Sequence, residues 1–442
     1  MSGRRVLILC YFYPPLAGGG VHRVLGFTRH LPRHGWDCTV VCAGPEDYWV
    51  RDETLAARVP RETEVIRVGG GSALSAWLRL RRGAAGKRSG RVFGGLRTLS
   101  DWWLLPDSYA GWARRARRVA EQRLARGDIE VVLSSSPPDS AHLAVPAPPW
   151  GGGAAGSGGR GHWVVDFRDP WIGLHFREPP TRLHAWRHAA LERGVVRRAS
   201  LVLAASRTHA DDLERRFPPG APGHPRVVHL PNGFEPDAGE AGESAAAPDP
   251  AHFVLAWTGT LSQMPDAEVF LEALHDLFAR RPEARRRIRA TLAGPFDADV
   301  ADRAVALGLT GIVSFPGPLA HADARALQRA ADLLLLWKPR GYRTMVPGKL
   351  YEYLDAGRPL LAVLDADDEC AALVRRAGGT VAPARDRAAL ADEIEGRYLA
   401  WRADGRAPDR RPAWLEEHTR SALSARLAGL LDDLVTPAGR TP

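Results

Sequence analysis

Lys349 and Glu352 stand three residues apart in VPGKLYEYLDAGRPLLAV, residues 346–363. This spacing places an ammonium and a carboxylate on one face of a short helix. Proline suits a first helical position and glycine suits the left-handed residue after a last turn, so we expect a helix over 347–356 that ends before Gly357. The apolar run that follows is typical of a buried strand.

The start of this helix offers free backbone donors. Val346 occupies the expected N-cap position and has no side-chain acceptor, which leaves the first amides, including that of Gly348, without a local partner. An anion satisfies such amides, and Lys349 is a cation where the helix dipole disfavours one unless an anion arrives. The pattern favours a phosphate-binding helix start, and a surface helix with an ordinary Lys/Glu pair is the alternative.

A glycine loop follows the first apolar run of the chain. Gly19 and Gly20 stand between a strand expected over 6–11 and a helix expected over 21–34, and glycines at such a junction let the backbone approach a ligand. The dinucleotide fingerprint G-x-G-x-x-G is broken because Arg23 stands at its sixth position, which disfavours nicotinamide and flavin cofactors. Arg23 is instead predicted to reach a phosphate or an acidic acceptor.

Polar residues follow two further short strands, in the stretches SSSPPDSAH and DFRDPW. Open α/β sheets bind ligands at the carboxyl ends of their strands. Asp169 and His142 are the candidates for orienting an acceptor, with local packing at a helix start as the alternative for His142. Asp166 and Arg168 are expected to form an internal ion pair behind the site.

Strand and helix patterns alternate along the chain, which predicts an α/β protein with two doubly wound parallel sheets and a cleft between them. The elements expected in the first half are 6–11, 21–34, 38–42, 131–133, 163–166, 182–198, 201–204, 206–217 and 227–230. Those expected in the second half are 253–258, 266–280, 289–293, 297–307, 312–315, 322–331, 333–337, 347–356, 360–364 and 368–377.

The length of 442 residues fits two domains of ordinary size. A polar stretch, EPDAGEAGESAAAPDPAH, separates the two series of elements. We therefore expect Rossmann-like domains at 1–235 and 251–405, followed by an amphipathic helix over 412–434.

Composition limits the class of protein. No apolar run is long enough to span a bilayer, and the N-terminus lacks a cleavage pattern, so we expect a cytoplasmic chain with a retained N-terminus. The four cysteines fall in apolar runs without a metal-ligand spacing, which indicates buried thiols and no metal site.

Positive charge is concentrated between residues 77 and 126. That segment holds thirteen basic and three acidic residues, a net charge of +10 in a chain whose total is +9. Tryptophan and leucine are interleaved with the charge, which suits an anionic membrane surface as a partner, and a solvated helix face is the alternative. Nucleic acid is disfavoured as a partner because no nucleic-acid-binding motif accompanies the charge.

In this order the pieces resemble glycosyltransferase family 4 of the GT-B fold over essentially the whole chain. The resemblance is carried by YPPLAGGGVHR, DFRDPW, HLPNGF, WTGTL and PGKLYEYLDAGRPLLAV. In that family the first domain binds the acceptor, the second binds a nucleotide-sugar, and the C-terminal helix returns to the first. Transfer retains the anomeric configuration and generally needs no metal or other cofactor.

The resemblance also implies roles for individual residues. Glu352 holds the ribose hydroxyls of the donor, and Lys349 with the helix start neutralises the departing diphosphate. Glycines are implied to contact the donor: Gly19, Gly20, Gly259 and Gly348.

Two positions depart from the family pattern. Thr344 stands where many members carry a glutamate, and 259–263 lacks the arginine and lysine that many members carry there. Arg340 and Arg343 are expected to supply the compensating positive charge.

The resemblance implies a retaining glycosyltransferase that moves a sugar from a nucleotide-sugar to a carbohydrate or lipid-linked acceptor. Such an enzyme would build a bacterial cell-envelope polysaccharide, as a cytoplasmic protein peripheral at the inner face of the plasma membrane. A nucleotide-sugar epimerase of similar fold and a catalytically degenerate binding scaffold are the alternatives.

Overall fold

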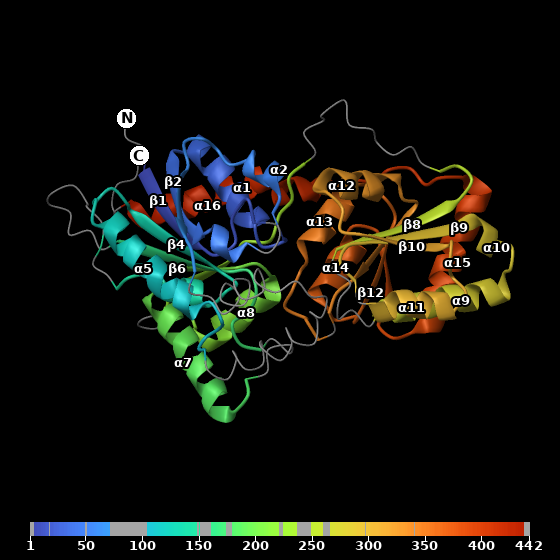
Figure 1. The fold of residues 1–442 in the computed structure, drawn as a ribbon, viewed down its shortest axis with the longest axis horizontal. Helices are drawn as coiled ribbons and strands as arrows, with labels where there is room; N and C mark the ends of the chain where they lie inside the picture. Colours follow the sequence, from blue (N-terminus) through green and yellow to red (C-terminus); the bar gives the residue numbers. More distant parts are fainter. Residues whose placement is uncertain are drawn as a thin grey trace. The chain divides into compact units, whose positions relative to one another are not determined.

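The computed structural model describes residues 4–16, 18–48, 51–70, 104–147, 150, 161–173, 179–220, 224–236, 249–259, 266–296, 298–339 and 341–436. The chain divides into two compact units (Figure 1). Unit 2 is the continuous stretch Phe234–Thr419, and unit 1 combines the chain up to Gly233 with the chain from Arg420 onward.

Unit 1 is built on a seven-stranded sheet in which every strand pairs parallel to its neighbours, in the order β3-β2-β1-β4-β5-β6-β7. The central strands are continuous apolar runs because both faces of the sheet are covered. The strands are β1 (Arg4–Cys10), β2 (Trp36–Ala43), β3 (Glu64–Val68), β4 (Val131–Ser136), β5 (His162–Phe167), β6 (Leu201–Ala204) and β7 (Arg226–His229).

Helices cover both faces of this sheet. One face carries α5 (Ala110–Leu124), α6 (Ser140–Leu143), α7 (Arg182–Arg198) and α8 (Arg207–Arg216), with Trp112, Val195 and Leu213 in their shared core. The other face carries α1 (His22–His30) and α16 (Arg420–Val435), which pack against each other. Short helices complete the unit: η1 (Leu31–His34), η2 (Pro45–Asp47) and α2 (Glu53–Ala56).

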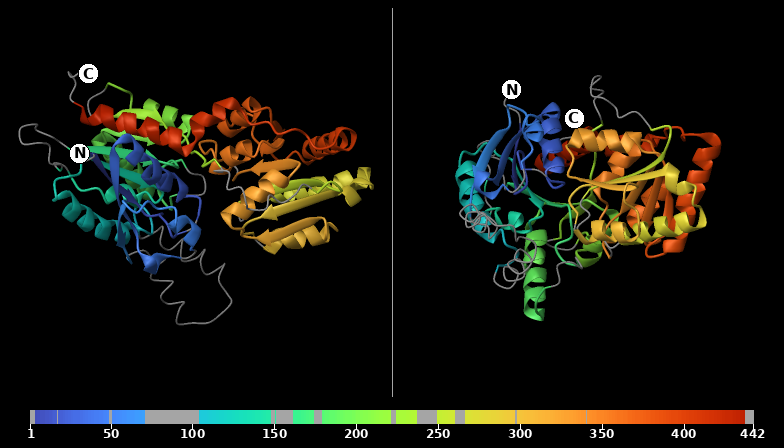
Figure 2. Two further views of the ribbon diagram at one scale, coloured as in Figure 1. Left: turned by 90° about the horizontal axis from the view of Figure 1, so that it is seen from above. Right: turned by 45° about the vertical axis from the view of Figure 1, so that its right-hand side comes forward.

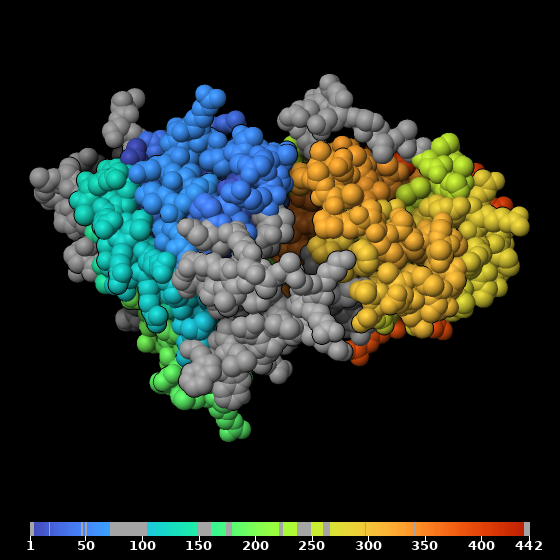
Figure 3. Space-filling model, in the orientation of Figure 1, coloured from blue at the N-terminus to red at the C-terminus, as the bar shows by residue number. Residues whose placement is uncertain are grey.

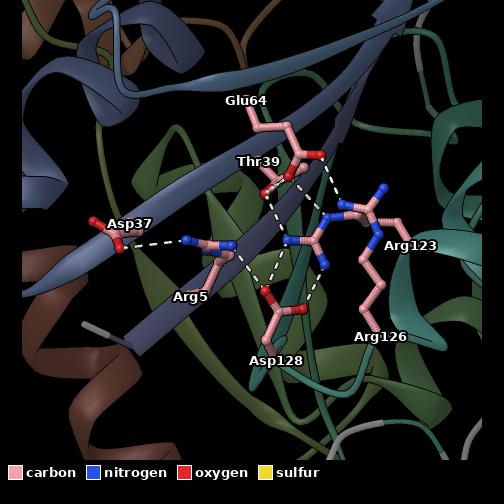
Figure 4. Close-up of polar contacts among 7 residues, drawn as sticks. All are labelled: Arg5, Asp37, Thr39, Glu64, Arg123, Arg126 and Asp128. Atoms are coloured by element: carbon pink, nitrogen blue, oxygen red, sulfur yellow. Dashed lines mark hydrogen bonds and ion pairs between the residues drawn. The ribbon is translucent and has the colours of Figure 1, made fainter. Parts of the chain in front are cut away.

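A network of polar contacts fastens α5 to the amino ends of the strands (Figure 4). The buried guanidinium of Arg123 donates to Asp128 at 2.5 and 2.9 Å and to Glu64 at 2.9 Å. Thr39 on β2 also donates to Glu64, and Arg5 on β1 donates to Asp128. One arginine of α5 thus connects the helix with strands that are distant in sequence.

Unit 2 has a six-stranded parallel sheet in the order β10-β9-β8-β11-β12-β13. Its strands are β8 (Phe253–Thr258), β9 (Ile288–Ala293), β10 (Val313–Gly317), β11 (Leu333–Trp337), β12 (Leu360–Leu364) and β13 (Thr380–Pro383). Its helices are α9 (Asp266–Arg280), α10 (Ala284–Arg287), α11 (Ala298–Ala306), α12 (His321–Ala330), α13 (Gly348–Asp355), α14 (Glu369–Arg376), α15 (Arg387–Asp404) and η3 (Ala413–His418). Figure 2 shows both sheets from two further directions.

The predicted fold class is confirmed, because both sheets are parallel and flanked by helices. The helix expected over 412–434 is wrong in detail: a 3₁₀ turn and α16 replace it, with Thr419 extended between them. Within the described residues, no helix is long and apolar enough to cross a membrane.

Candidate functional site

Helix α13 begins one residue later than its proline predicts. Pro347 is the N-cap in extended conformation and Gly348 is the first helical residue, so the predicted cap at Val346 is wrong. No side chain caps this end of the helix, and among its first amides that of Leu350 donates to the carbonyl of Pro347. The predicted left-handed glycine is confirmed, since Gly357 has a φ of 71°, but the helix ends at Asp355, one residue before the predicted end, with Ala356 as its C-cap.

The ammonium of Lys349 lies on an aromatic ring. Its Nζ is 4.0 Å from the centroid of the Trp257 ring, and Trp257 in turn stacks on Trp337 with centroids 5.4 Å apart and ring planes 10° apart. The two tryptophans come from β8 and β11, the neighbouring strands at which the order of the sheet reverses. Ligands of open α/β sheets bind at this switch point, beyond the carboxyl ends of the strands.

Gly259 makes room for the lysine. It follows β8 with a φ of 147°, and a Cβ added there would lie 2.1 Å from Lys349 Nζ. Gly294 follows β9 in a similar way, and a Cβ there would collide with the carbonyl oxygen of Gly259 at 1.4 Å. Only glycine fits at both positions, because the backbones and the lysine approach so closely.

The surroundings of Lys349 disfavour its charge. Burial lowers the pKa of Lys349 to about 7, while the Glu352 carboxylate favours the charged form and opposes that shift. In the part of the chain that the structure describes, no carboxylate forms an ion pair with this ammonium. The site is therefore a largely desolvated cation in the first turn of a helix that no side chain caps, an arrangement that a phosphate anion complements.

Glu352 lies one turn further along α13 and keeps part of its carboxylate exposed. Its Oε1 is 3.6 Å from Nε2 of His321, the first residue of α12. A carboxylate in this position accepts hydrogen bonds from hydroxyl groups. Sequence reasoning identified Glu352 but missed His321, which lies 31 residues earlier and belongs to no motif.

A buried set of side chains holds α12, α13 and β8 together. Arg325 on α12 donates to Gln328 and to the backbone carbonyl of Glu352, and it forms an ion pair with Asp355. Gln328 donates to the hydroxyl of Thr258 at the end of β8. Tyr353 accepts a hydrogen bond from the Thr258 amide at 2.7 Å, so α13 is connected directly to the strand below Lys349. These contacts were missed by sequence reasoning because they join residues of three elements.

The residues upstream of α13 are only partly described. Arg343 forms an exposed ion pair with Asp367 at 2.6 Å, and Arg340 lies outside the described residues. The buried Lys338 donates to the Met345 carbonyl and to Asp368, which fixes the loop on α14. In this structure Arg343 is paired with Asp367. The contribution of Arg343 to a donor site remains a prediction.

The glycine loop of unit 1 is held by Arg168. The guanidinium donates to the carbonyls of Ser136 and Pro137, at 2.8 and 2.6 Å, and to the carbonyl of Gly20. A Cβ at Gly20 would lie 2.9 Å from this guanidinium, whereas Gly19 has open space around it. Arg168 thus connects the loops that follow β1, β4 and β5.

Asp166 forms an ion pair with Arg23, and not with Arg168 as predicted. Nη2 of Arg23 lies 2.8 Å from Oδ1 of Asp166, and Nε of Arg23 also donates to the carboxylate. Arg23 is buried and donates further to the carbonyls of Leu230 and Pro231. The donors of Arg23 thus join α1 to β5 and to the end of β7, and its predicted contact with a phosphate remains a prediction.

His142 is enclosed in the core of unit 1. Its Nδ1 lies 2.8 Å from the Ser134 hydroxyl, and its ring contacts Phe167 and Trp171. Burial lowers the pKa of His142 to about 3, so the ring is neutral at physiological pH. These contacts agree with the packing alternative for His142, and its role toward an acceptor remains a prediction. Asp169 is half-buried after β5, near the charge of Arg168.

Within the described residues no cluster of histidine, cysteine, aspartate or glutamate is arranged to hold a metal. All four cysteines are buried and free, and burial raises the pKa of Cys38 and Cys42 to about 12.

A cavity of about 1120 Å³ opens in unit 2 beside Asp332 and Trp401. It lies at the amino ends of the strands and includes none of the predicted site residues.

Comparisons with known proteins identify the fold. The sequence matches no protein-family model, and no curated protein gives a significant match. Similar solved structures include sucrose-phosphate synthase from Thermosynechococcus elongatus, with 15% identity, a TM-score of 0.59 and coverage of 98% of this chain and 99% of that chain. Anabaena HepE in complex with UDP-glucose has 14% identity, a TM-score of 0.61 and coverage of 97% and 99%. WaaG, a glycosyltransferase involved in lipopolysaccharide biosynthesis, has 16% identity, a TM-score of 0.56 and coverage of 97% and 99%. The chain has the GT-B fold of these proteins.

Proposed function

We propose that the protein is a nucleotide-sugar-dependent glycosyltransferase of family 4. The observation that carries the proposal is the Lys349 ammonium, which lies largely buried on Trp257 beside the uncapped start of α13. A nucleotide diphosphate supplies the negative charge that this cation and these amides complement. The fold agrees, since the similar structures include a glycosyltransferase and a complex with UDP-glucose.

The proposed reaction breaks the bond between the anomeric carbon and the diphosphate and forms one to an acceptor hydroxyl. Lys349 and the α13 amides stabilise the charge that develops on the leaving diphosphate. Glu352 accepts hydrogen bonds from the ribose hydroxyls. The departing phosphate takes the proton of the acceptor, so that transfer with retention needs no separate protein base and, as in the family that the chain resembles, no metal.

The proposed acceptor is a lipid-linked sugar or a polysaccharide of the bacterial cell envelope, reached at the cytoplasmic face of the membrane. The resemblance to family 4 supports this acceptor, and the similarity to a protein of lipopolysaccharide biosynthesis agrees with it. The donor contacts of Gly19, Gly20, Gly259, Gly348, Arg340 and Arg343 and the acceptor contact of Asp169 remain predictions.

A catalytically degenerate scaffold is the second candidate. Thr344 replaces a carboxylate of the family pattern, and Arg343 is engaged by Asp367.

Thermal shift with a panel of nucleotide-sugars identifies the donor, and turnover is then followed in the presence of membrane extract. Free nucleotide together with a glycosylated acceptor supports transfer. An isomerised sugar points to an epimerase, and binding without turnover points to the scaffold.

Glu352→Gln tests the ribose contact. We expect donor affinity to fall by roughly tenfold or more, because a carboxylate that accepts two hydroxyl donors is replaced by an amide with one acceptor. Calorimetry measures the affinity, and Glu268→Gln on the exposed face of α9 is the control. Equal affinity in Glu352→Gln and the wild type would remove the assignment.

A further inference from the structure

Helix α7 exposes two large apolar side chains near its N-terminal end. Trp186 is 66% exposed and Leu183 is 55% exposed, and their spacing of three residues places them on one face of the helix. Figures 1 and 2 show α7 projecting from unit 1 with this end outermost. Large apolar side chains gathered at an exposed tip are typical of a contact surface.

The same helix is strongly basic. The exposed charged side chains of α7 are all arginines: Arg182, Arg187, Arg193, Arg197 and Arg198. The single carboxylate of the helix, Glu192, is buried and forms an ion pair with Arg216 of α8. No acidic group on α7 therefore offsets the exposed positive charge.

Helix α5 extends this charge. Its outer face presents Arg114, Arg115, Arg117 and Arg118, with Glu121 as its only carboxylate. Arg117 lies close enough to Arg198 to help lower the pKa of the latter. Both helices pack on the same face of the unit 1 sheet, and Figure 3 displays them at its lower left. We name the exposed arginines of α5 and α7 the basic face.

We infer that the basic face docks on an anionic membrane surface, with Trp186 and Leu183 inserted at the level of the headgroups. Tryptophan favours the boundary between headgroups and acyl chains, and anionic lipids attract the surrounding arginines. A polyanion in solution would use the arginines but offers no apolar phase for Leu183, which favours the membrane. Membrane binding itself follows from the side chains of α5 and α7. Only its use, which is to bring the enzyme to a membrane-bound acceptor, rests on the proposed function.

The full-length protein is mixed with vesicles of phosphatidylcholine and phosphatidylglycerol, or of phosphatidylcholine alone, and bound protein is measured after sedimentation. We expect binding to the anionic vesicles only. The double variant Leu183→Ser/Trp186→Ser should bind about tenfold more weakly because it loses the inserted apolar groups. Arg182→Gln/Arg187→Gln should lose about fivefold for each arginine.

Two controls match these changes outside the basic face. Val305→Ser removes a 64% exposed apolar side chain from α11, and Arg286→Gln neutralises an exposed arginine of α10. Both controls should bind vesicles like the wild type. Undiminished binding of either α7 variant overturns the inference, and so does equal binding to neutral vesicles. Capture by heparin or DNA without vesicle binding also overturns it, in favour of a soluble polyanion.

Donor binding, measured by calorimetry on the same variants, separates this inference from the proposed function. Normal donor binding without vesicle binding overturns the docking surface alone. Vesicle binding by a protein that takes no nucleotide-sugar overturns the proposed function alone.

Discussion

Lys349 is poised between its two protonation states. Burial disfavours the ammonium and lowers the pKa of Lys349 to about 7, so this lysine titrates close to neutral pH. A bound diphosphate would favour the charged form and raise this pKa toward its ordinary range. Donor binding and proton uptake are then linked between the two pKa values.

We therefore predict that donor affinity falls with increasing pH above about 7, by about tenfold per pH unit until the pKa of the complex is reached. Below pH 7 the lysine is already protonated and the affinity should level off. Calorimetry over this range measures both affinity and protons taken up. Lys349→Met should bind weakly at every pH, and a wild-type affinity that is flat above pH 7 would contradict the linkage.

Gly259 is the second residue on which the site depends. In Gly259→Ala the new methyl group would lie 2.1 Å from the Lys349 ammonium and overlap it. The backbone φ of 147° at this position is also strained for any residue other than glycine. We expect a loss of stability of about 1–3 kcal/mol together with a marked loss of donor affinity.

Gly311→Ala is the matched control for this variant. Gly311 also has a positive φ, 76°, but no atom lies within 4 Å of the added Cβ. Thermal unfolding should show a loss of stability in both variants, whereas only Gly259→Ala should lose donor affinity. Equal affinities in the two would mean that the lysine position does not matter.

Among the elements, α5 shows how a helix is fixed by one buried side chain. Arg123 is bound by Glu64 and Asp128, and its hydrogen bonds lower the pKa of Asp128 to about 2. A carboxylate whose native pKa is below its ordinary value of 3.8 stabilises the fold above that value. The stabilisation is lost as the pH falls through about 2.

Arg123→Met should lower the free energy of unfolding by about 2 kcal/mol at neutral pH, because two carboxylates lose a buried partner, although both remain partly exposed. The difference from the wild type should shrink as the pH approaches 2. Arg126→Met removes a mostly exposed arginine from the same network and should cost less than about 0.5 kcal/mol. Denaturant unfolding over pH measures both variants, and equal losses would refute the role of burial.

Elements with continuous patterns were predictable from the sequence. The bounds of α7, β6, β8, α9, β11 and β12 match the expected ones, because each is a run of apolar or periodic residues with turn signals at its ends. The strands β3 and β13 were missed, since both are short, lie at sheet edges and have partly exposed residues.

The candidate site divides in the same way. Lys349 and Glu352 could be placed on one face from the sequence, because their spacing lies within one helix. The contacts of Lys349 with Trp257 and of Arg23 with Asp166 could not be predicted, since each joins residues far apart in the chain. The sequence does not show whether an arginine faces a ligand or another element of the fold, because tertiary packing determines which of the two it contacts.

At the scale of the whole molecule, the residues of the candidate donor site that the structure brings together, Lys349, Glu352, Gly259 and Trp257, belong to unit 2 alone. We predict that a bound nucleotide-sugar slows amide hydrogen exchange in α13 and at the end of β8, since ligand binding suppresses local opening. Mass spectrometry of peptides locates the protection. Protection confined to unit 1 would place the donor elsewhere.

The return of α16 to unit 1 sets an order of events during synthesis. Unit 2 is one continuous stretch, whereas α16 supplies Leu423, Leu427 and Leu431 to a core that also holds Phe27. While the ribosome is still making unit 2, the sheet face under α1 lacks this cover and exposes apolar surface. Unit 2 can therefore finish folding before unit 1, and we expect the nascent first half to be prone to aggregation until α16 has been made.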